Sequence, residues 1–556
     1  MTEADLAHEQ IERLVRSLAE GRPHVIRRTS LWLVADVPAF DLPEHGWKLH
    51  VSCREAEFAE FVRVVVPVLL GLGCPFKVAR TPVLLRALNS GLRTPAAVGK
   101  ACTVYPPQDR VREIGLTLAA LLRGRTGPRV VSDRRVSADA PVYYRYGPFV
   151  SSWNADARGQ VTSRLRGPGG EVFDGEASLT YRQPSWAKDP FAGEPAPGRL
   201  VVGGHYRIVG GVYESARGNV YRAVDERDGS TVIVKQARAF VLEAEGGLDA
   251  RLRLRNERHV LSLLDGVEGV PRFLDHFRHG DDEFLVLTDL GRRNLEQDLL
   301  AHGRYLTAAE SPPPGRELEE LARSLARTLF QVHERGVIMY DLSPKNVVVN
   351  DGRAYVVDFG FAASAGIHMT GGTMGYMPAR QRRRAEPLDH DDWHGLGMTL
   401  WHAAAFQQPV DSDEDFDLPR VRALQQIRRL HGPAPDGVIG AIAALLSGDP
   451  GRAHAAARLL AADGARSFTG ERARPSLPAL PRVDDDLVAR LTRTVLGDLV
   501  AQTATVIDGL SDSPGEHDAS LYSGSAGVAM ELLRHPDSPE AAALLPRLLE
   551  HARTTA

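Results

Sequence analysis

Hydrophobic residues follow two different periods along the central part of the chain. Short apolar and alternating runs predict strands at residues 206–209, 219–224 and 231–235. Beyond residue 318, apolar side chains recur every three or four positions, which predicts one face of a helix, and Gly336 suits its C-terminal cap. Strands first and helices afterwards predict an α+β domain rather than a doubly wound sheet.

A strand near the N-terminus has two chemically different faces. Between His45 and Ser52, alternation places Lys48, His50 and Ser52 on one face and apolar residues on the other. We expect the apolar face to lie in a hydrophobic core. The polar face, with a lysine two positions from a histidine, is a candidate for chemistry.

Two stretches rich in proline and glycine divide the chain. They cover residues 186–204 and 464–482, and their composition disfavours helix interiors and central strands. A chain of 556 residues is also too long for one hydrophobic core. We therefore expect domains at residues 1–185 and 205–463, and a shorter helical segment at residues 483–556.

The composition is that of an ordinary globular protein, with 43% hydrophobic and 25% charged residues, which excludes a disordered, collagen-like or coiled-coil chain. The net charge of −4 gives no bias towards nucleic acid or membrane surfaces. Three cysteines, all within the first 102 residues, form neither a disulfide framework nor a Cys-x-x-Cys zinc pair. The acidic start lacks the order of a secretory signal, and the apolar runs are too short to span a bilayer, which predicts a cytoplasmic protein.

A group of residues suited to phosphoryl transfer lies between residues 339 and 360. This reaction needs a carboxylate to orient the attacking hydroxyl, and oxygen ligands that hold magnesium on the phosphates. Asp341 suits the first role. Asn346 and Asp358 suit the second, because magnesium prefers hard oxygen ligands.

The spacing of Asp341 and Asn346, followed by Asp358-Phe-Gly, resembles the catalytic and metal-binding segments of protein kinases. This resemblance implies a bilobal protein-kinase fold, a nucleotide cofactor that is either ATP or GTP, and Mg²⁺. It further implies a nucleotide-binding set made of Gly218, Val220, Lys235 and Glu257.

Departures from the kinase pattern bear on activity. Tyr213 and Ser215 replace two glycines of the phosphate-covering loop, and Tyr340 replaces an arginine that reads activation-loop phosphorylation in many kinases. Ser343 replaces the lysine that usually neutralises the transferred phosphoryl group, which leaves Lys345 as a candidate substitute. A pseudokinase scaffold that only binds a peptide is therefore one alternative, although the catalytic aspartates are intact.

Basic and aromatic residues recur through residues 1–185. Arginines with planar forks and lysines as point charges would bind a dianionic phosphate well. A lysine buried among other cations has a lowered pKa, because desolvation and like charge both disfavour its ammonium form, and this suits a general base. With a histidine that donates a proton to the departing phosphate, such a group could perform β-elimination on phosphoserine or phosphothreonine.

The segments 47–52, 76–77 and 143–147 resemble the N-terminal lyase domain of class III and class IV lanthipeptide synthetases. The resemblance implies a phosphothreonine-lyase-like α+β domain with Lys77 as the base and His50 as the acid. It also implies that phosphate is bound by a set that consists of Lys48, Tyr105, Arg134, Arg135 and Arg145.

A lyase domain followed by a kinase domain also matches that family. The order implies a peptide partner, a precursor with a leader and a core that contains Ser, Thr and Cys. Its Ser and Thr residues would be phosphorylated and then converted to dehydroalanine and dehydrobutyrine. A bacterial Ser/Thr protein kinase with an unrelated N-terminal domain is the competing enzyme.

The final segment is similar to the opening of the cyclase domain in the same synthetases. The similarity rests on residues 520–529, which lead into a helix. Class IV cyclases bind zinc through cysteine and histidine, but no cysteine follows Cys102. We therefore expect only the first part of a cyclase domain, and no zinc, in this chain.

Overall fold

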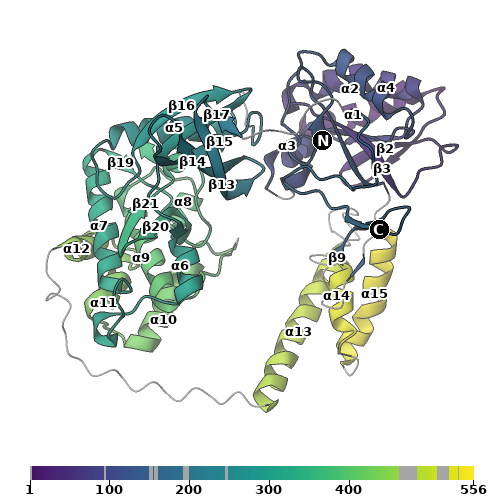
Figure 1. The fold of residues 1–556 in the computed structure, drawn as a ribbon. Coiled ribbons are helices and arrows are strands. Elements are labelled where there is room, and N and C mark those ends of the chain that lie inside the picture. The colour runs from purple at the N-terminus through teal and green to yellow at the C-terminus, as the bar shows by residue number, and fades with distance from the viewer. Residues whose placement is uncertain are drawn as a thin grey trace. The chain divides into compact units, whose positions relative to one another are not determined.

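The computed structural model describes residues 3–92, 95–149, 154–155, 161–191, 200–243, 248–412, 414–462, 485–509, 525–535 and 538–555. The chain divides into two compact units, one of Met1–Arg27 with Leu33–Pro475 and one of Arg28–Trp32 with Ser476–Ala556. The first unit contains an N-terminal α+β domain and a bilobal domain (Figure 1). The predicted multidomain α+β class is confirmed.

A seven-stranded sheet forms the centre of the N-terminal domain, with the spatial order β1-β2-β4-β5-β3-β7-β6. Its strands are β1 Val25–Arg28, β2 Trp32–Asp36, β3 His45–Val51, β4 Phe76–Ala79, β5 Cys102–Val104, β6 Arg134–Arg135 and β7 Val142–Pro148. The neighbours β4, β5, β3 and β7 pair antiparallel. Two short hairpins follow, made of β8 Asn154–Ala155, β9 Val161–Thr162, β10 Arg164–Arg166 and β11 Val172–Asp174.

Helix packing covers the apolar side of strand β3. The helices of this domain are α1 Glu3–Ala19, α2 Phe58–Leu72, α3 Pro82–Ser90 and α4 Val111–Leu121. Trp47, Leu49 and Val51 are buried, as the alternation predicts. Gly115 of α4 approaches so closely that a methyl group on it would lie 3.5 Å from Leu49. The opposite face of β3 is thereby left to its polar residues.

The N-terminal lobe of the bilobal domain is a six-stranded sheet in the order β12-β13-β14-β15-β17-β16, with one helix beside it (Figure 1). Its elements are β12 Val201–Val202, β13 Tyr206–Ser215, β14 Gly218–Asp225, β15 Thr231–Ala237, α5 Ala250–Leu263, β16 Phe273–His279 and β17 Asp282–Thr288. The three predicted strands form parts of β13, β14 and β15. Asp249 caps α5, because its side chain accepts a hydrogen bond from the backbone of Arg251.

The C-terminal lobe is mainly helical. Its helices are α6 Leu295–His302, α7 Leu318–Glu334, α8 Ala379–Arg382, α9 Asp389–Ala405, α10 Leu418–His431, α11 Gly437–Leu445 and α12 Pro450–Ala461. Its short strands are β18 Arg293–Asn294, β19 Val337–Ile338, β20 Val347–Asn350, β21 Arg353–Val356 and β22 Ala363–Ser364.

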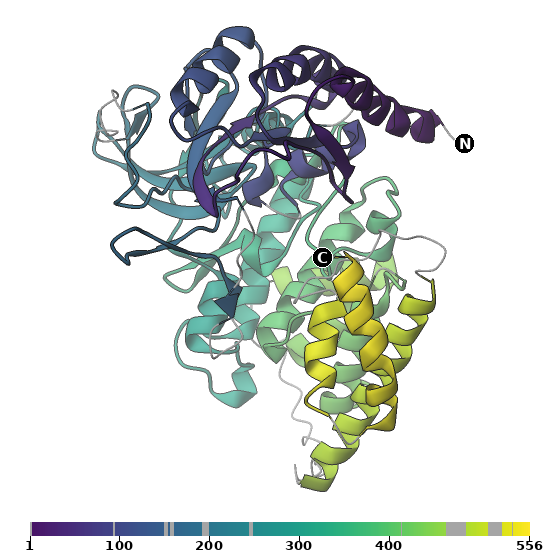
Figure 2. The same cartoon turned by 90° about the vertical axis from the view of Figure 1, so that its right-hand side faces the viewer.

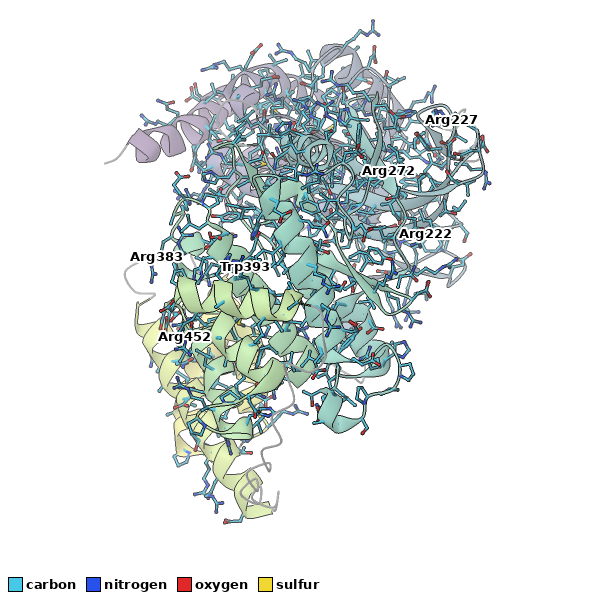
Figure 3. The ribbon with its side chains drawn as sticks, turned by 90° about the vertical axis from the view of Figure 1, so that its left-hand side faces the viewer. Arg222, Arg227, Arg272, Arg383, Trp393 and Arg452 are labelled. Carbon is cyan, nitrogen blue, oxygen red and sulfur yellow. The ribbon has the colours of Figure 1, made fainter. Side chains whose placement is uncertain are left out.

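The predicted helix with its apolar face is α7. Its buried residues include Leu321, Leu325, Leu329 and Val332. Gly336 has a φ of 70°, the left-handed conformation that favours glycine after a helix. Trp393 of α9, labelled in Figure 3, is buried in the same core. Its ring packs against Phe330 and His333.

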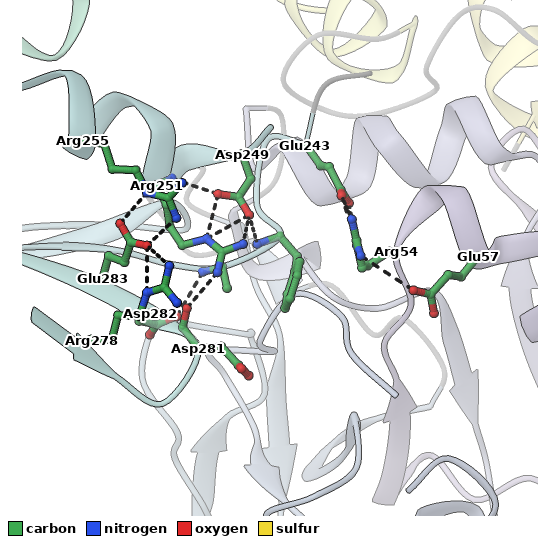
Figure 4. A network of polar contacts seen from close by, with 12 residues as sticks. Arg54, Glu57, Glu243, Asp249, Arg251, Arg255, Arg278, Asp281, Asp282 and Glu283 are labelled. Carbon is green, nitrogen blue, oxygen red and sulfur yellow. Dashed lines mark hydrogen bonds and ion pairs between the residues drawn. The ribbon is translucent and has the colours of Figure 1, made fainter. Parts of the chain in front are cut away.

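Polar contacts, some of them drawn in Figure 4, and a small apolar cluster join the two domains of the first unit. Arg54 of the N-terminal domain pairs with Glu243, which lies in the loop before α5. In the same loop, the backbone of Leu242 donates a hydrogen bond of 3.1 Å to the carbonyl oxygen of Asn89. A small apolar cluster joins Val98 of the N-terminal domain to two residues of the bilobal domain, Ala216 and Val241. The turn between β13 and β14 and the loop after β15 thus both contact the N-terminal domain.

The described part of the second unit has three helices, α13 Asp485–Gly509, α14 Ser525–Leu532 and α15 Pro539–Thr555. Helices α14 and α15 lie side by side (Figures 1 and 2) and share a small core that includes Leu532, Leu544 and Leu548. Residues 520–524 of the predicted cyclase-like opening lie outside the described residues. Across the described chain, every helix is too short or too polar to cross a membrane.

Candidate active sites

The sheet of the N-terminal domain brings the predicted base and acid together. Lys77 of β4 pairs with Thr103 of β5, and Thr103 pairs in turn with His50 of β3. Residues that are directly opposite in an antiparallel sheet carry their side chains on the same face. Lys77 and His50 therefore share one face with a single strand between them, which separates their Cα atoms by about 10 Å.

A second row of the same face carries two more cations. Lys48 precedes His50 by two residues and is directly opposite Arg145 of β7. The Lys48 ammonium donates a hydrogen bond of 2.7 Å to the carbonyl oxygen of Pro148, and Arg145 donates one of 2.8 Å to that of Gly175. These backbone acceptors fix both side chains in place at the site.

His50 is oriented by a carboxylate that the sequence did not single out. Its Nδ1 lies 2.6 Å from Oδ2 of Asp133, and both side chains are buried. Ser132 donates a hydrogen bond of 2.6 Å to the other oxygen of Asp133. Because Nδ1 is engaged, Nε2 is the ring nitrogen that His50 offers to a substrate.

The electrostatics of the site favour a neutral histidine until an anion binds. Burial lowers the pKa of His50 to about 3, although Asp133 acts to raise it and Lys100 and Lys48 lower it further. Burial acts to raise the pKa of Asp133, but His50, Lys100 and Arg145 outweigh burial and lower it. A bound phosphate dianion would add negative charge beside His50 and raise its pKa towards the imidazolium form.

The lysines of the site have lowered pKa values. Burial lowers the pKa of Lys77. Burial and the charges of Arg145, Lys100 and Lys77 lower the pKa of Lys48 well below its usual value. Burial lowers the pKa of Lys100 to about 8, against the opposing effect of Asp133. These shifts favour the neutral form of the lysines, which is the form that a general base requires.

Lys100 and Asp133 are the site residues that sequence reasoning missed. Both are outside strands, Lys100 in the turn before β5 and Asp133 in the turn before β6, so alternation could not assign them to a face. The one available signal was chemical, because a histidine that acts as an acid is usually held by a carboxylate.

The three remaining predicted phosphate ligands occupy different surroundings. Arg134 pairs with Tyr144 on the opposite face of the sheet and forms an ion pair of 2.8 Å with Asp189. Arg135 shares the face of His50, but its Nε donates a hydrogen bond of 3.1 Å to the hydroxyl of Tyr143. Tyr105 follows β5 in phase with Thr103, and its ring packs edge-on against Phe149. Arg134 is thus the one predicted ligand that the sheet directs away from the cluster.

In the bilobal domain, the predicted nucleotide-binding lysine links two carboxylates. Nζ of Lys235 on β15 lies 2.7 Å from Oε1 of Glu257 on α5 and 3.2 Å from Oδ1 of Asp358. Burial acts to lower the pKa of Lys235, but the two carboxylates outweigh it and raise the pKa. Glu257 also accepts a hydrogen bond from the backbone of Phe359. Glu257 on α5 therefore holds the side chain of Lys235 at the site.

The predicted catalytic carboxylate, Asp341, is held from two sides. Its Oδ1 accepts a hydrogen bond of 2.7 Å from the backbone of Thr373, and its Oδ2 accepts one of 3.1 Å from Asn346. Burial raises the pKa of Asp341 to about 6. A carboxylate with a raised pKa is a stronger base, which suits removal of a proton from a hydroxyl.

A buried aspartate supports the loop that carries Asp341. Asp392 of α9 accepts hydrogen bonds from the backbone of Met339 at 2.8 Å and of Tyr340 at 2.7 Å. His333 contacts the same carboxylate at 2.7 Å. Tyr340 has a φ of 65°, a conformation that a non-glycine residue keeps only where its surroundings enforce it.

The glycine loop is built on a close approach of two strands. A Cβ atom on Gly218 would lie 1.8 Å from the carbonyl oxygen of Gln236, so only glycine fits. Val220 pairs with Lys235, which places both side chains on the same face of the sheet. Gly218 and Val220 on β14 thus lie beside the strand of Lys235, which contacts Glu257, and their role in nucleotide binding stays a prediction.

The chemistry of the predicted magnesium ligands suits that ion. Asn346 uses its amide nitrogen on Asp341, which leaves its side-chain oxygen for a metal, and Asp358 adds a carboxylate. Among the described residues, no three His, Cys, Asp or Glu side chains are placed to hold a metal. Mg²⁺ in proteins is commonly held by one or two side chains, with waters and substrate phosphates as its other ligands.

Family comparisons agree with the two domains. Residues 14–200 match a family described as RamC, N-terminal domain, and residues 211–440 match the protein kinase domain family. The chain thus has a region similar to the RamC N-terminal domain, followed by a region similar to protein kinase domains. Protein kinase domains in general use ATP and Mg²⁺.

Individual relatives point the same way. The probable SapB synthase of Streptomyces coelicolor is 33% identical over 334 residues, which cover 58% of this chain and 35% of that relative. The probable serine/threonine-protein kinase pknA2 of Bifidobacterium longum is 26% identical over 235 residues, 40% of this chain and 29% of that kinase. The matched regions thus span about a third of these relatives. With the domain order, they confirm the predicted resemblance to class III and class IV lanthipeptide synthetases.

Proposed function

We propose that this protein dehydrates Ser and Thr residues of a ribosomally made precursor peptide in two steps, as in lanthipeptide biosynthesis. The bilobal domain phosphorylates the hydroxyl group, and the N-terminal domain eliminates the phosphate. The products are dehydroalanine from Ser and dehydrobutyrine from Thr. The likeness to a probable SapB synthase, together with the matches of this chain to the RamC N-terminal domain and the protein kinase domain, supports this pairing of activities.

In the first step, Asp341 accepts the proton of the substrate hydroxyl as its oxygen attacks the terminal phosphorus of the nucleotide. Lys235 binds the nucleotide phosphates, and Glu257 holds Lys235 in place. Mg²⁺ bound by Asn346 and Asp358 would neutralise phosphate charge. The leaving group is the nucleoside diphosphate, and either ATP or GTP supplies the same chemistry.

In the second step, neutral Lys77 removes the α-proton of the phosphorylated residue. The electrons of that C–H bond form the Cα–Cβ double bond, and the bond from Cβ to the phosphate oxygen breaks. The departing phosphate takes a proton from Nε2 of His50, and Asp133 stabilises the imidazolium before transfer. Lys48, Lys100 and Arg145 bind the phosphate oxygens. Lys77 ends protonated, His50 ends neutral, and phosphate is released.

The observation that carries this proposal is the single face of β4, β5, β3 and β7, on which Lys77, His50, Lys48 and Arg145 meet. A protein kinase with an unrelated N-terminal domain has no need of a buried cation cluster around a histidine–aspartate pair. The direct test uses a synthetic phosphoserine peptide without nucleotide. Elimination that stops in Lys77→Met supports the proposal, and a phosphopeptide left intact by the unmodified protein contradicts it.

A further inference from the structure

The loop of Asp341 carries a serine, Ser343, at the position where protein kinases usually have a lysine. Ser343 is buried, and its hydroxyl forms a hydrogen bond of 3.2 Å with that of Thr373. Lys345, the predicted substitute, is exposed. Phosphoryl transfer concentrates negative charge on the oxygens of the moving group, so a cation from another element is needed.

Helix α5 places an arginine beside the magnesium-binding aspartate. Arg253 is four residues before Glu257, so both side chains point from the same face of the helix. A methyl group on Gly360 would lie 3.6 Å from both Nε and Nη2 of Arg253, and 3.4 Å from Oδ1 of Asp358. Arg253 and Asp358 therefore border the same small space.

The guanidinium of Arg253 packs on an aromatic ring, and one of its donors, Nε, has no hydrogen-bond partner among the described residues. Its guanidinium carbon lies 3.6 Å from the ring centroid of Phe361. Asn256, on the same helix, donates a hydrogen bond of 2.9 Å to the carbonyl oxygen of Ala362, which ties α5 to this segment. Among the described residues, Nε of Arg253 is buried without a hydrogen-bond partner. A buried unsatisfied donor at an active site indicates a group that is supplied by a ligand.

The neighbouring carboxylates favour the charged form of Arg253. Burial lowers the pKa of Arg253, while the carboxylates of Asp358 and Asp341 act to raise it. Both carboxylates are therefore close enough to act on the guanidinium. When Mg²⁺ neutralises Asp358, the arginine keeps its charge and its planar fork for phosphate oxygens.

We propose that Arg253 binds the terminal phosphoryl group of the nucleotide and supplies the cation that Ser343 does not. This assignment rests on the proposed kinase activity. It makes α5 a phosphate-binding element as well as the support of Lys235. We assign it to the terminal phosphate because Arg253 borders the same space as Asp358, the proposed magnesium ligand.

Nucleotide binding to the full chain in Mg²⁺ tests this assignment without a peptide substrate. The probes are ADP and a non-hydrolysable ATP analogue, and the readout is the dissociation constant of each. Arg253→Met should raise the dissociation constant of the ATP analogue about tenfold or more, because a charge-assisted hydrogen bond is lost. The dissociation constant of ADP should change by no more than about twofold. Arg253→Lys should recover part of the difference. Arg258→Met is the matched control, because Arg258 is an exposed arginine on the same helix.

Two results would overturn the assignment while the kinase proposal stands. In the first, Arg253→Met weakens the binding of the analogue and of ADP equally, which would show that Arg253 only supports the fold around Phe361. Alternatively, neither constant could change. If the unmodified protein binds neither nucleotide, the proposed kinase activity is wrong, and the assignment is wrong with it.

Discussion

Replacement of Asp133 by Asn isolates the role of the carboxylate behind His50. The change keeps the size of the side chain and removes its charge. Asp133 lies 2.6 Å from Nδ1 of His50, and the exposed fractions of the two side chains are 4% for His50 and 0% for Asp133. A hydrogen bond to a charged group is worth about 1.5–3 kcal/mol, so we expect elimination to slow by about tenfold to hundredfold.

The same substitution alters the cations of the site. Asp133 acts to raise the pKa values of Lys48, Lys100 and Arg145, so its loss makes their charged forms less favourable. A buried cation cluster without its carboxylate is also less stable, by about 3–5 kcal/mol for a broken buried pair. We expect inorganic phosphate to recover part of that loss, because it binds only the folded site.

The assay follows the mass of a synthetic phosphoserine peptide over time, without nucleotide. Phosphorylation by the same preparation reports whether the rest of the chain is folded. Asp139→Asn is the control, since Asp139 is exposed and lies in the same segment. A folded Asp133→Asn protein that eliminates phosphate at the unmodified rate would refute the role of Asp133.

Three other predictions test separate parts of the structure. The Lys77→Met protein should eliminate phosphate at least about a hundred times more slowly, so that phosphopeptide accumulates in mass spectra. Lys188→Met, a change at an exposed lysine, is the control and should leave the rate unchanged. The rate of phosphorylation should fall as the pH drops through about 6, because protonated Asp341 cannot accept a proton from the substrate hydroxyl. A rate that stays constant between pH 5 and 7 would contradict this. Leu329→Ala in the core should lower the free energy of unfolding by about 2–5 kcal/mol, and Leu300→Ala, whose side chain is 73% exposed, by less than about 0.5 kcal/mol in denaturant titrations.

The kinase half of the chain was predictable because its chemistry follows local order. Asp341, Asn346 and Asp358 are close in sequence, and the strand of Lys235 and helix α7 have regular periods. The partner of Lys235, Glu257, could be named because the kinase pattern expects a carboxylate on the first helix. Arg253 has no counterpart in that pattern and is found only when α5 packs against Phe361.

The N-terminal domain was less predictable because its candidate site is assembled from four strands that are distant in sequence. Alternation assigned Lys48 and His50 correctly to one face, since both are on β3. Arg134 and Arg135 are adjacent, so they face opposite sides, but which of them shares the face of His50 depends on the register of β6 with β7. That register is a tertiary property and is not visible in the sequence.

The central claim is that one chain both adds phosphate to a peptide hydroxyl and eliminates it. The most direct measurement is the mass of a Ser- and Thr-containing precursor peptide after incubation with the full chain, nucleotide and Mg²⁺. We expect the peptide to lose the mass of one water for each modified residue. With the Lys77→Met protein, we expect it to gain the mass of phosphate instead. A stable gain of phosphate with the unmodified protein, or no change in mass, would contradict the central claim.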